Sequence, residues 1–425
     1  MKLEQMNQAQ LQEQQTKLQK EFDRYKQMGL SLNMARGKPS PAQLDLSAPL
    51  FDILSYDDYK AADGTDVRNY GVMDGLPEAK QIFADFLGME PANIIIGGSA
   101  SLNLMWDVAT RAMLKGVLPD YTPWCKLDAV KFLCPAPGYD RHFTICQTLG
   151  IEMIPVPMLD DGPDMDVVEN LVATDASIKG IWCVPMYSNP EGVTYSDTVV
   201  RRLAAMPTAA VDFRIFWDNA YGVHHLDMED YDQLLNIYEA CQAAGNPDRA
   251  YIFASTSKIT FAGAGISAMA ASPVNIAYQK KLLNAQTISY DKVNQLRHVR
   301  FLKNFDGLMA LMAEHAKIMK PKFDLVHQML ERELGGLGCA TWKHPKGGYF
   351  VSVDVMDGCA KRVVALCKEA GVVLTGAGAT FPYGKDPRDR NIRLAPSYPG
   401  LDELEKSMEL FCLAVKLAAV EKLLG

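Results

Sequence analysis

Residues Tyr251–Lys258 read Tyr-Ile-Phe-Ala-Ser-Thr-Ser-Lys, an apolar run that closes in hydroxyl groups and one lysine. An apolar run bounded by small polar residues is typical of a buried parallel strand that ends in a loop. In open α/β sheets, ligands bind just outside the carboxyl ends of the strands. Lys258 is therefore predicted to lie at a ligand site, where its amine can form a Schiff base with an aldehyde cofactor. A surface lysine after a strand is the plainer alternative.

Two further apolar runs end in polar residues in the same way. Residues 180–187 lead into Ser-Asn-Pro-Glu-Gly, and residues 213–218 lead into Asn-Ala-Tyr. The carboxyl ends of parallel strands meet at one edge of a sheet, so the side chains that follow these runs are expected close together. The set predicted at this edge is Asn189, Asp218, Tyr221 and Lys258.

The rest of the chain repeats the alternation of strand and helix. Short apolar runs at 93–98, 130–134 and 151–156 read as strands, and helical patterns follow in the intervening segments. This alternation predicts an α/β protein with a largely parallel sheet, because parallel neighbours need crossover helices.

Residues 2–28 are rich in Gln, Glu, Lys and Leu and contain neither Gly nor Pro, which predicts a helix. Leu18, Phe22 and Tyr25 follow one another at spacings of four and three, so they share one helical face. That apolar face packs either on the protein's own domain or on a partner subunit, and the sequence leaves both possibilities open.

Composition limits the classes of protein and partner. A chain of 425 residues with 48% hydrophobic residues can bury a large core in one long or two ordinary domains. The net charge of −8 argues against nucleic acid or an anionic membrane as the main partner. The nine cysteines form no Cys-x-x-Cys pair and no metal-ligand spacing with the seven histidines, so no metal site is predicted and reduced thiols in the cytoplasm are expected. No signal peptide or membrane-spanning run is apparent.

The motif order Asn-Pro-x-Gly at 189–192, Asp-x-x-Tyr at 218–221 and Ser-x-x-Lys at 255–258, followed by a late arginine, resembles the fold-type I aminotransferases that depend on pyridoxal phosphate (PLP). The segment Ala-Arg-Gly-Lys-Pro at 35–39 resembles their class I, aspartate aminotransferase-like branch. The resemblance covers the chain from about residue 33 to the C-terminus.

This resemblance implies a large domain, with a mostly parallel seven-stranded sheet between helices, and a smaller α+β domain. The expected boundaries are 1–50 for the N-terminal helix and a segment joining the small domain, 51–315 for the large PLP-binding domain, and 316–425 for the small C-terminal domain.

The resemblance also implies roles at the predicted sheet edge. Lys258 would hold PLP as an imine and, once displaced by an amino acid, would abstract the Cα proton. Asp218 would keep the pyridine nitrogen protonated, while Asn189 and Tyr221 would bond to the phenolic oxygen of the ring. Tyr139 would stack on the ring, although an aromatic residue after Pro-Gly is commonly just turn packing. The catalytic residues implied are Lys258, Asp218 and Tyr221.

A second group of residues is expected at the PLP phosphate. Ser99, Ala100 and Ser101 open a predicted helix, and small residues there leave backbone amides free for an anion. Ordinary N-capping explains Ser99 equally well. By resemblance, Ser255 adds a phosphate contact and Tyr70 reaches the phosphate of the neighbouring subunit.

The chain departs from the family pattern at the phosphate arginine. Most relatives carry that arginine eight residues beyond the lysine, where this chain has Ile266. Free amides of residues 263–265 can help but supply no full charge. Lys292 and Arg297 are candidate substitutes, and exposed helix charges are the alternative interpretation of both.

Arg393, in Asn-Ile-Arg-Leu-Ala, matches the arginine that binds the α-carboxylate of the substrate in relatives. A guanidinium suits this role because two parallel N–H donors match two carboxylate oxygens, although a structural salt bridge is the alternative. By resemblance, Asn189 and the Arg36–Gly37 segment also bind substrate. A dicarboxylate needs a second cation, and the candidates left open are Arg36, Lys38 and Arg141.

The function that follows is ping-pong transamination between an L-amino acid and a 2-oxo acid, with aspartate and 2-oxoglutarate the favoured pair. A homodimer with shared active sites is inherited from the resemblance. A PLP-dependent carbon–sulfur β-lyase and a non-catalytic PLP-binding regulator are the alternatives. The regulator usually needs a DNA-binding module, for which the N-terminal helix is too short.

Overall fold

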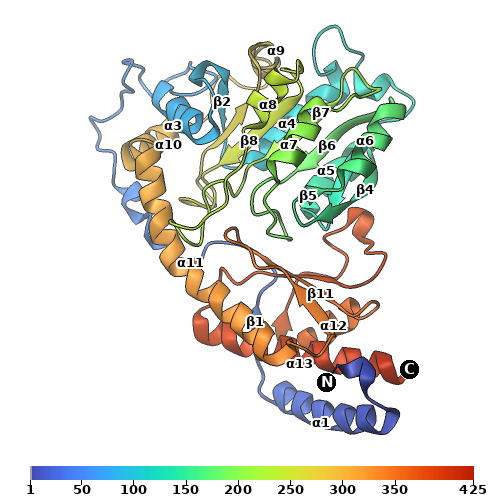
Figure 1. Ribbon diagram of the computed structural model, residues 1–425. Helices are drawn as coiled ribbons and strands as arrows, with labels where there is room; N and C mark the ends of the chain where they lie inside the picture. The colour runs from blue at the N-terminus through green and yellow to red at the C-terminus, as the bar shows by residue number, and fades with distance from the viewer. Residues whose placement is uncertain (1) are drawn as a thin grey trace.

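The computed structural model describes residues 2–425 (Figure 1). Met1, the first residue of the predicted segment 1–50, lies outside the described residues. The chain forms an upper lobe around a large sheet and a lower lobe in which both marked ends of the chain lie. The long helix α11 (Phe305–Leu334) runs from one lobe to the other.

The large sheet has seven strands of four residues or more and an eighth strand of two residues. Five neighbouring strands run parallel, β9 is antiparallel to both of its neighbours, and β5 is antiparallel to β4. The mostly parallel sheet expected from the sequence is therefore confirmed, with β5 as an addition. In spatial order the strands are β2 (Ile94–Gly97), β9 (Ser267–Ala270), β8 (Ala250–Ser255), β7 (Arg214–Asp218), β6 (Ile178–Cys183), β3 (Lys131–Ala136), β4 (Glu152–Leu159) and β5 (Gly162–Pro163).

Successive side chains of the central strands enter two different hydrophobic clusters. Phe216 and Phe253 lie in the cluster on one face of the sheet, whereas Trp217 and Ile252 lie in the cluster on the other. This follows from the period of two in a strand, and it requires helices on both faces. The helices of the upper lobe are α3 (Pro77–Leu87), α4 (Ser101–Lys115), α5 (Asp140–Leu149), α6 (Met165–Thr174), α7 (Asp197–Ala205), α8 (Ile237–Ala243), α9 (Pro273–Leu283) and α10 (Lys292–Leu302).

One predicted strand is shorter than its apolar run. The run 180–187 predicts a strand that continues to Tyr187, but β6 ends at Cys183. Pro185 cannot donate to a ladder, and Tyr187 takes a left-handed φ of 47°, so the chain leaves the sheet before the apolar residues end. The resulting loop carries Asn189 towards the lower lobe.

The lower lobe combines segments from both ends of the chain. Its elements are α1 (Gln8–Gln27), β1 (Leu32–Asn33), α2 (Pro41–Asp45), β10 (Ala340–Trp342), β11 (Val351–Val355), α12 (Ala360–Glu369), β12 (Val372–Val373), β13 (Asn391–Leu394) and α13 (Leu401–Leu424). β10, β11 and β13 form an antiparallel sheet, and β1 pairs with β12 in parallel. Short 3₁₀ helices occur at η1 (Leu3–Gln5), η2 (Ala48–Phe51), η3 (Pro91–Asn93), η4 (Trp124–Lys126) and η5 (Pro382–Gly384).

Helix α11 contributes to the cores of both lobes. Its residues Leu308 and Met312 belong to an upper cluster, and Met319 and Phe323 belong to the lower one. On this basis we propose a domain boundary after residue 315, within the helix, with residues before about 50 joining the lower lobe.

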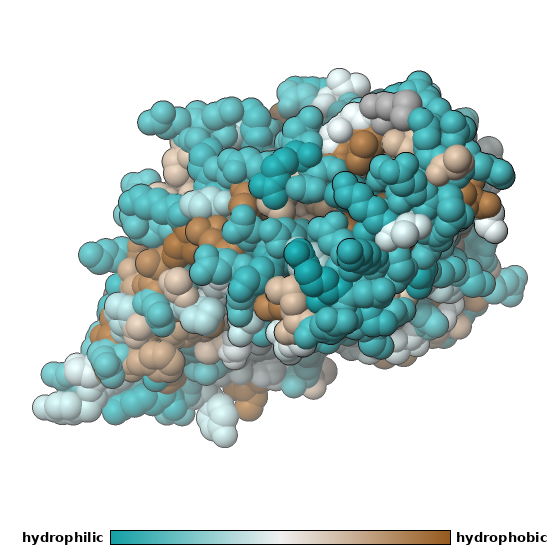
Figure 2. Space-filling view, turned by 90° about the horizontal axis from the view of Figure 1, so that it is seen from below, coloured by the Kyte–Doolittle hydropathy of each residue, from teal (hydrophilic) through white to brown (hydrophobic). Residues whose placement is uncertain are grey.

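Helix α1 packs on the C-terminal helix α13 at the bottom of the molecule (Figure 1). Leu18, Phe22 and Tyr25 are buried on the shared face, and the Tyr25 hydroxyl donates to Glu409 Oε2 at 2.8 Å. The apolar face is thus covered by the chain's own lower lobe. Seen from below, the surface is mostly hydrophilic, with hydrophobic residues in small groups (Figure 2).

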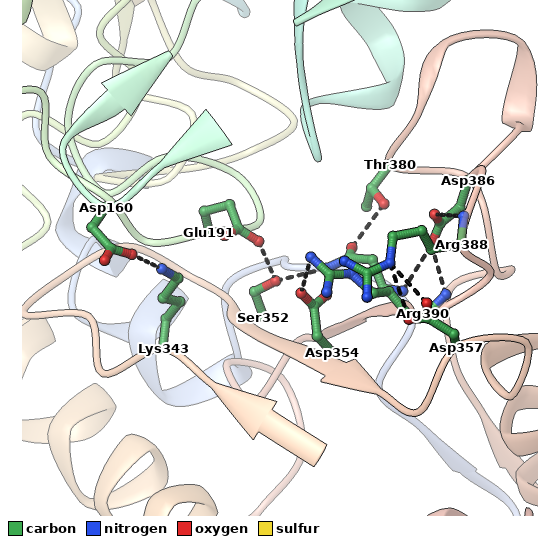
Figure 3. A network of polar contacts seen from close by, with 11 residues as sticks. Asp160, Glu191, Lys343, Ser352, Asp354, Asp357, Thr380, Asp386, Arg388 and Arg390 are labelled. Atoms are coloured by element: carbon green, nitrogen blue, oxygen red, sulfur yellow. Dashed lines mark hydrogen bonds and ion pairs between the residues drawn. The ribbon is translucent and has the colours of Figure 1, made fainter. Parts of the chain in front are cut away.

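Polar contacts join the two lobes beside the sheet edge (Figure 3). Glu191, in the loop after β6, accepts a hydrogen bond from Ser352 Oγ of β11 at 2.5 Å. Asn391 of β13 donates to the same Ser352 oxygen, and Thr380 Oγ1 donates to Asn391 Oδ1. Gly138 N, after β3, donates to Thr380 O at 2.7 Å. Strand β13, which carries Arg393, is therefore tied to two loops at the carboxyl edge of the large sheet.

Candidate active site

Lys258 lies at the carboxyl edge of the large sheet. Strands β7 and β8 are parallel neighbours in which Asp218 pairs with Phe253, so the turn after Ser255 lies beside the turn after Asp218. Lys258 is half-buried, and its Nζ is 5.0 Å from the ring centroid of Tyr221. The structure thus brings together the lysine and the Asp-x-x-Tyr turn that sequence reasoning predicted for one edge.

Asp218 presents one carboxylate oxygen without a donor. The side chain is buried, and its Oδ2 lies 3.0 Å from Nε2 of His142. Its Oδ1 is also buried and has no hydrogen-bond partner among residues 2–425. Leaving a buried acceptor unpaired costs about 1–3 kcal/mol, and more for a charged group. An N–H donor from a bound ring is the group that this oxygen fits.

His142 supports Asp218 from behind, and sequence reasoning missed it. Its ring stacks on Trp182 at 4.4 Å between centroids and meets Tyr139 edge-on at 4.9 Å. Stacking fixes the plane of the imidazole, so its Nε2 is held toward the carboxylate. One signal in the sequence could have found His142. It follows Tyr139 by three residues at the start of a helix, so both side chains can face the same edge of the sheet.

Tyr139 occupies the N-cap position of α5, and its side chain makes no cap hydrogen bond there. Burial raises the pKa of its phenol to about 12, partly offset by the positive charge of Lys258. Burial, followed by the charge of Asp218, likewise raises the pKa of the Tyr221 phenol. Both phenols therefore stay protonated at neutral pH and can donate hydrogen bonds.

Arg393 enters the site from β13 of the lower lobe. It is 7% exposed, and its Nη1 donates to Asn189 Oδ1 at 3.1 Å and to Asp140 Oδ1 at 3.3 Å. Its Nη2 donates to Thr375 Oγ1 at 3.3 Å, while Nε is buried without a partner in the described part of the chain. The predicted pair Arg393 and Asn189 is thus brought together, and a buried guanidinium N–H remains for an anionic ligand. Asp140 and Thr375 are contacts that the sequence did not reveal.

Gly37 packs against the ring that lies under Arg393. The guanidinium carbon of Arg393 is 4.7 Å from the ring centroid of Phe350. A Cβ added at Gly37 would lie 2.5 Å from Cζ of the same ring, so a larger residue would displace the ring. Of the neighbouring cations, Lys38 has its Nζ 3.8 Å from the ring centroid of Tyr398, and Arg36 is exposed. Arg141 is exposed as well.

Three loops converge at the amino end of α4. A Cβ added at Gly265 would lie 3.0 Å from both Ser257 N and Ser99 O, so glycine permits this close approach. Ser267 Oγ donates to Gly98 O, and the hydroxyls of Ser255 and Ser257 are 2.7 Å apart. Helix α4 begins at Ser101, and its N-cap residue, Ala100, supplies no side-chain cap. Its first amides are therefore available for an anion.

The side chains of Ile266 and Lys292 are both engaged in contacts within the chain. Ile266 is buried in the hydrophobic cluster that includes Ile96 and Ile259. The Lys292 amine donates to Asn69 O at 2.7 Å, Gly71 O at 2.9 Å and Ser289 Oγ at 3.1 Å. All three N–H bonds of the ammonium are thus used within its own chain. Of the two candidates for replacing the phosphate arginine, Lys292 and Arg297, these contacts disfavour Lys292.

Lys292 instead holds the segment that carries Tyr70. The two carbonyls it binds flank that residue, whose side chain is 79% exposed. Arg297, half-buried on the same helix, stays the remaining candidate among the two cations considered from the sequence.

Among residues 2–425, no cluster of three or more His, Cys, Asp and Glu side chains is arranged to hold a metal ion. None of the helices in that range combines the length and apolarity needed to cross a bilayer.

The carboxyl edge of the sheet thus carries a half-buried lysine and a buried carboxylate with one oxygen unpaired among residues 2–425. A buried arginine with an N–H unpaired in the same range enters from the lower lobe. The family model described as aspartate amino-transferase matches residues 6–425. The chain therefore belongs to the aspartate aminotransferase family.

Individual relatives agree with this membership. The chain is 52% identical over 398 residues to a putative aminotransferase of Mycolicibacterium smegmatis, covering 93% of each chain. It is 46% identical over 404 residues to an aspartate aminotransferase of Corynebacterium glutamicum, covering 95% of this chain and 93% of the relative. It superposes on the crystal structure of an aspartate transaminase from Corynebacterium glutamicum with a TM-score of 0.97 and 45% identity, covering 100% of this chain and 99% of the other.

The family and the fold class expected from the sequence are thus confirmed. Fold-type I aminotransferases depend on PLP and transfer amino groups between amino acids and 2-oxo acids. The chain is an aminotransferase of this type.

Proposed function

We propose that the protein catalyses PLP-dependent transamination between aspartate and 2-oxoglutarate, at the edge where Lys258, Asp218 and Arg393 meet. The observation that carries this proposal is the unpaired, buried Oδ1 of Asp218, braced through Oδ2 by His142 and close to the lysine turn. The relative of Corynebacterium glutamicum named aspartate aminotransferase supports the choice of amino acid.

The residues present fit the cofactor at each of its ends. Asp218 would accept from the pyridine N–H, and Tyr139 would lie along the ring. Asn189 and Tyr221 would contact the phenolic oxygen. The phosphate would be held by the first amides of α4 and by hydroxyls, the residues concerned being Ser99, Ala100, Ser101 and Ser255. PLP, when bound, withdraws electrons from the Cα of the amino acid.

The chain's own groups would then bind the substrate and move one proton. Arg393, with Asn189 beside it and Gly37 nearby, would bind the α-carboxylate through paired N–H donors. Lys258 Nζ would take the Cα proton and return it on the cofactor side, acting as a positioned general base and acid. Asp218 would hold a proton on the ring nitrogen. The second 2-oxo acid would use the same groups in reverse order.

The test is a half-reaction screen of the PLP-loaded protein. Each amino acid is added alone while the cofactor absorbance is followed, and the 2-oxo acid formed is identified. Aspartate and glutamate are expected to react fastest and to leave one 2-oxo acid per site. Release of pyruvate and ammonia without an amino acceptor would instead identify a β-lyase.

Arg393→Lys is expected to weaken binding of aspartate, glutamate and alanine alike, by roughly tenfold or more, because lysine keeps the charge but loses the planar fork. The choice of bond broken at Cα should also become less strict, since the carboxylate is no longer held in one plane. The measurement is half-reaction kinetics with product analysis for the three amino acids. A loss confined to the dicarboxylates would place Arg393 at the distal carboxylate.

Lys292→Met is expected to weaken PLP binding by about tenfold. The variant loses the hydrogen bonds that hold residues 69–71, the segment whose Tyr70 would reach the phosphate of the neighbouring subunit. Hydrogen bonds to a charged group contribute about 1.5–3 kcal/mol each. The PLP dissociation constant measured by fluorescence titration checks this. Arg300→Met is the matched control, because Arg300 lies on the same helix as Lys292 and its ion pair is with Asp58. Equal PLP affinity in wild type and Lys292→Met would contradict the anchoring role.

A homodimer with shared sites is the assembly we propose. Large aromatic side chains stand exposed along the 50–70 region, with Phe51 at 73%, Tyr56 at 94% and Tyr70 at 79% exposure. Aromatic side chains are enriched in the interfaces between protein chains, so this region is the one that we propose the partner covers. Since all nine cysteines are free thiols, a reducing compartment such as the cytoplasm is the proposed location.

A further inference from the structure

Behind Lys258 lies a buried set of polar side chains that the proposed reaction does not use. We name Ser40, Gln43, His315 and Tyr349 the Gln43 network. Its members come from the lead-in to α2, from α2, from α11 and from the turn before β11, and each is at most 4% exposed. Four polar side chains buried at one point are costly unless every donor and acceptor is used.

In the Gln43 network, the donor and the acceptor of each hydrogen bond follow from the neighbouring contacts. Gln43 Oε1 accepts from Ser40 N at 3.0 Å, which fixes the orientation of the amide. Gln43 Nε2 is then 3.1 Å from His315 Nδ1 and 2.9 Å from Tyr349 Oη, so its two N–H bonds serve these two acceptors. His315 Nε2 must carry the ring proton, because it lies 2.9 Å from the Ile259 carbonyl, which can only accept.

The network ends on the backbone of the lysine itself. Tyr349 Oη, which accepts from Gln43, donates to the Lys258 carbonyl at 3.4 Å. The carbonyls of Lys258 and Ile259 are thus both bound by side chains that meet at Gln43. Burial lowers the pKa of His315, which agrees with the neutral ring that the hydrogen bonds require.

The same network begins at the segment that borders the substrate. Ser40 follows Lys38 by two residues, and Tyr349 directly precedes Phe350. The Phe350 ring contacts Gly37 and lies under Arg393. The Gln43 amide therefore connects the lysine turn with the Gly37 segment and with Phe350, the ring that lies against Arg393.

We propose that Gln43 and His315 are positioning residues, which fix the Lys258–Ile259 turn relative to the Gly37 segment through one neutral hydrogen-bond network. This inference deepens the proposed function and rests on it, because it gives Lys258 its place in the reaction. Small displacements of a reacting group, of the order of 1 Å, can cost about 100-fold in rate.

The first test measures Lys258 in the protein without cofactor. Reductive methylation with isotope-labelled formaldehyde, followed by peptide mass spectrometry, gives the modification rate of this one lysine at a fixed pH. His315→Phe should raise that rate at least about threefold, because a loosened turn exposes a half-buried amine. His315→Gln, whose amide can still donate to the Ile259 carbonyl, should restore a rate near that of wild type.

Two further variants separate positioning from simple destabilisation. His327→Phe makes the same change on the same helix, where His327 stacks on His344 at 4.2 Å between ring centroids, and it should leave the Lys258 rate unchanged. Gln43→Met removes the centre of the network without touching Lys258, and it should act as His315→Phe does. Thermal unfolding of all four variants gives their stabilities for comparison.

The second test uses the PLP-loaded protein. His315→Phe and Gln43→Met should lower the half-reaction rate at saturating aspartate by roughly tenfold or more, with His315→Gln closer to wild type. The inference is overturned if His315→Phe matches His327→Phe in the Lys258 modification rate, or if His315→Gln is no better than His315→Phe. Failure of wild type to bind PLP would overturn the proposed function alone, since the modification experiment needs neither cofactor nor turnover.

Discussion

Lys258→Ala is expected to lower the rate of the aspartate half-reaction by roughly 10⁴-fold or more. A positioned general base contributes about 10²–10⁴-fold by itself, and this change also removes the amine that would hold the cofactor covalently. Lys258 Nζ lies 5.0 Å from the centroid of the Tyr221 ring, in the turn that follows the strand next to the one ending at Asp218. Stopped-flow measurement of the cofactor absorbance after mixing with aspartate checks the rate.

The control for this change is Lys317→Ala. Lys317 is on the surface of α11, where its amine pairs with Glu314, so its loss should leave the half-reaction unchanged. Far-ultraviolet circular dichroism of both variants tests whether the fold is kept. A Lys258→Ala protein that still transaminates within about tenfold of wild type would show that another group performs the proton transfer.

Asp218→Asn is expected to slow proton abstraction by about 10²–10³-fold, which corresponds to roughly 3–4 kcal/mol of barrier. A neutral amide cannot hold the ring nitrogen protonated, so the cofactor withdraws electrons less well. The substitution keeps the shape of the side chain and an oxygen that accepts from His142. PLP should therefore remain bound, with affinity reduced much less than the rate.

Asp212→Asn is a matched control for this prediction. Asp212 is also a buried carboxylate, bound to Lys179 at 2.7 Å and to Trp124 Nε1 at 2.8 Å, but it precedes β7, whereas Asp218 ends that strand. Its loss should reduce the melting temperature without slowing the half-reaction of the folded protein. If Asp218→Asn reacts as fast as wild type, Asp218 does not hold the ring nitrogen.

Much of the sheet edge could be predicted from the sequence because it is built from local signals. Apolar runs that end in polar residues identified the turns after β7 and β8, and parallel pairing necessarily places such turns side by side. The loop after β6 was less predictable. Its apolar residues continue past Cys183, but Pro185 and the left-handed Tyr187 end the strand, and only the folded backbone shows where Asn189 then lies.

The supporting residues could not be predicted because their roles depend on packing between distant segments. Gln43 and His315 are separated by 272 residues, and neither belongs to a motif that signals chemistry. Thr375 lies in the loop after β12, and only the packing of the lower lobe shows that this loop reaches Arg393 of β13. Lys292 illustrates the reverse case: its position suggested a phosphate ligand, but three oxygen acceptors of its own chain surround its amine.

The most direct test of the account is borohydride reduction of the PLP-loaded protein, followed by proteolysis and peptide mapping. Reduction fixes the cofactor on the amine that holds it, and the account predicts one pyridoxyl group per chain, on Lys258. Prior addition of aspartate should prevent this labelling, because the amino acid displaces the lysine. Label on another lysine, or none on a protein that has bound PLP, would contradict the assignment of Lys258 and with it the proposed mechanism.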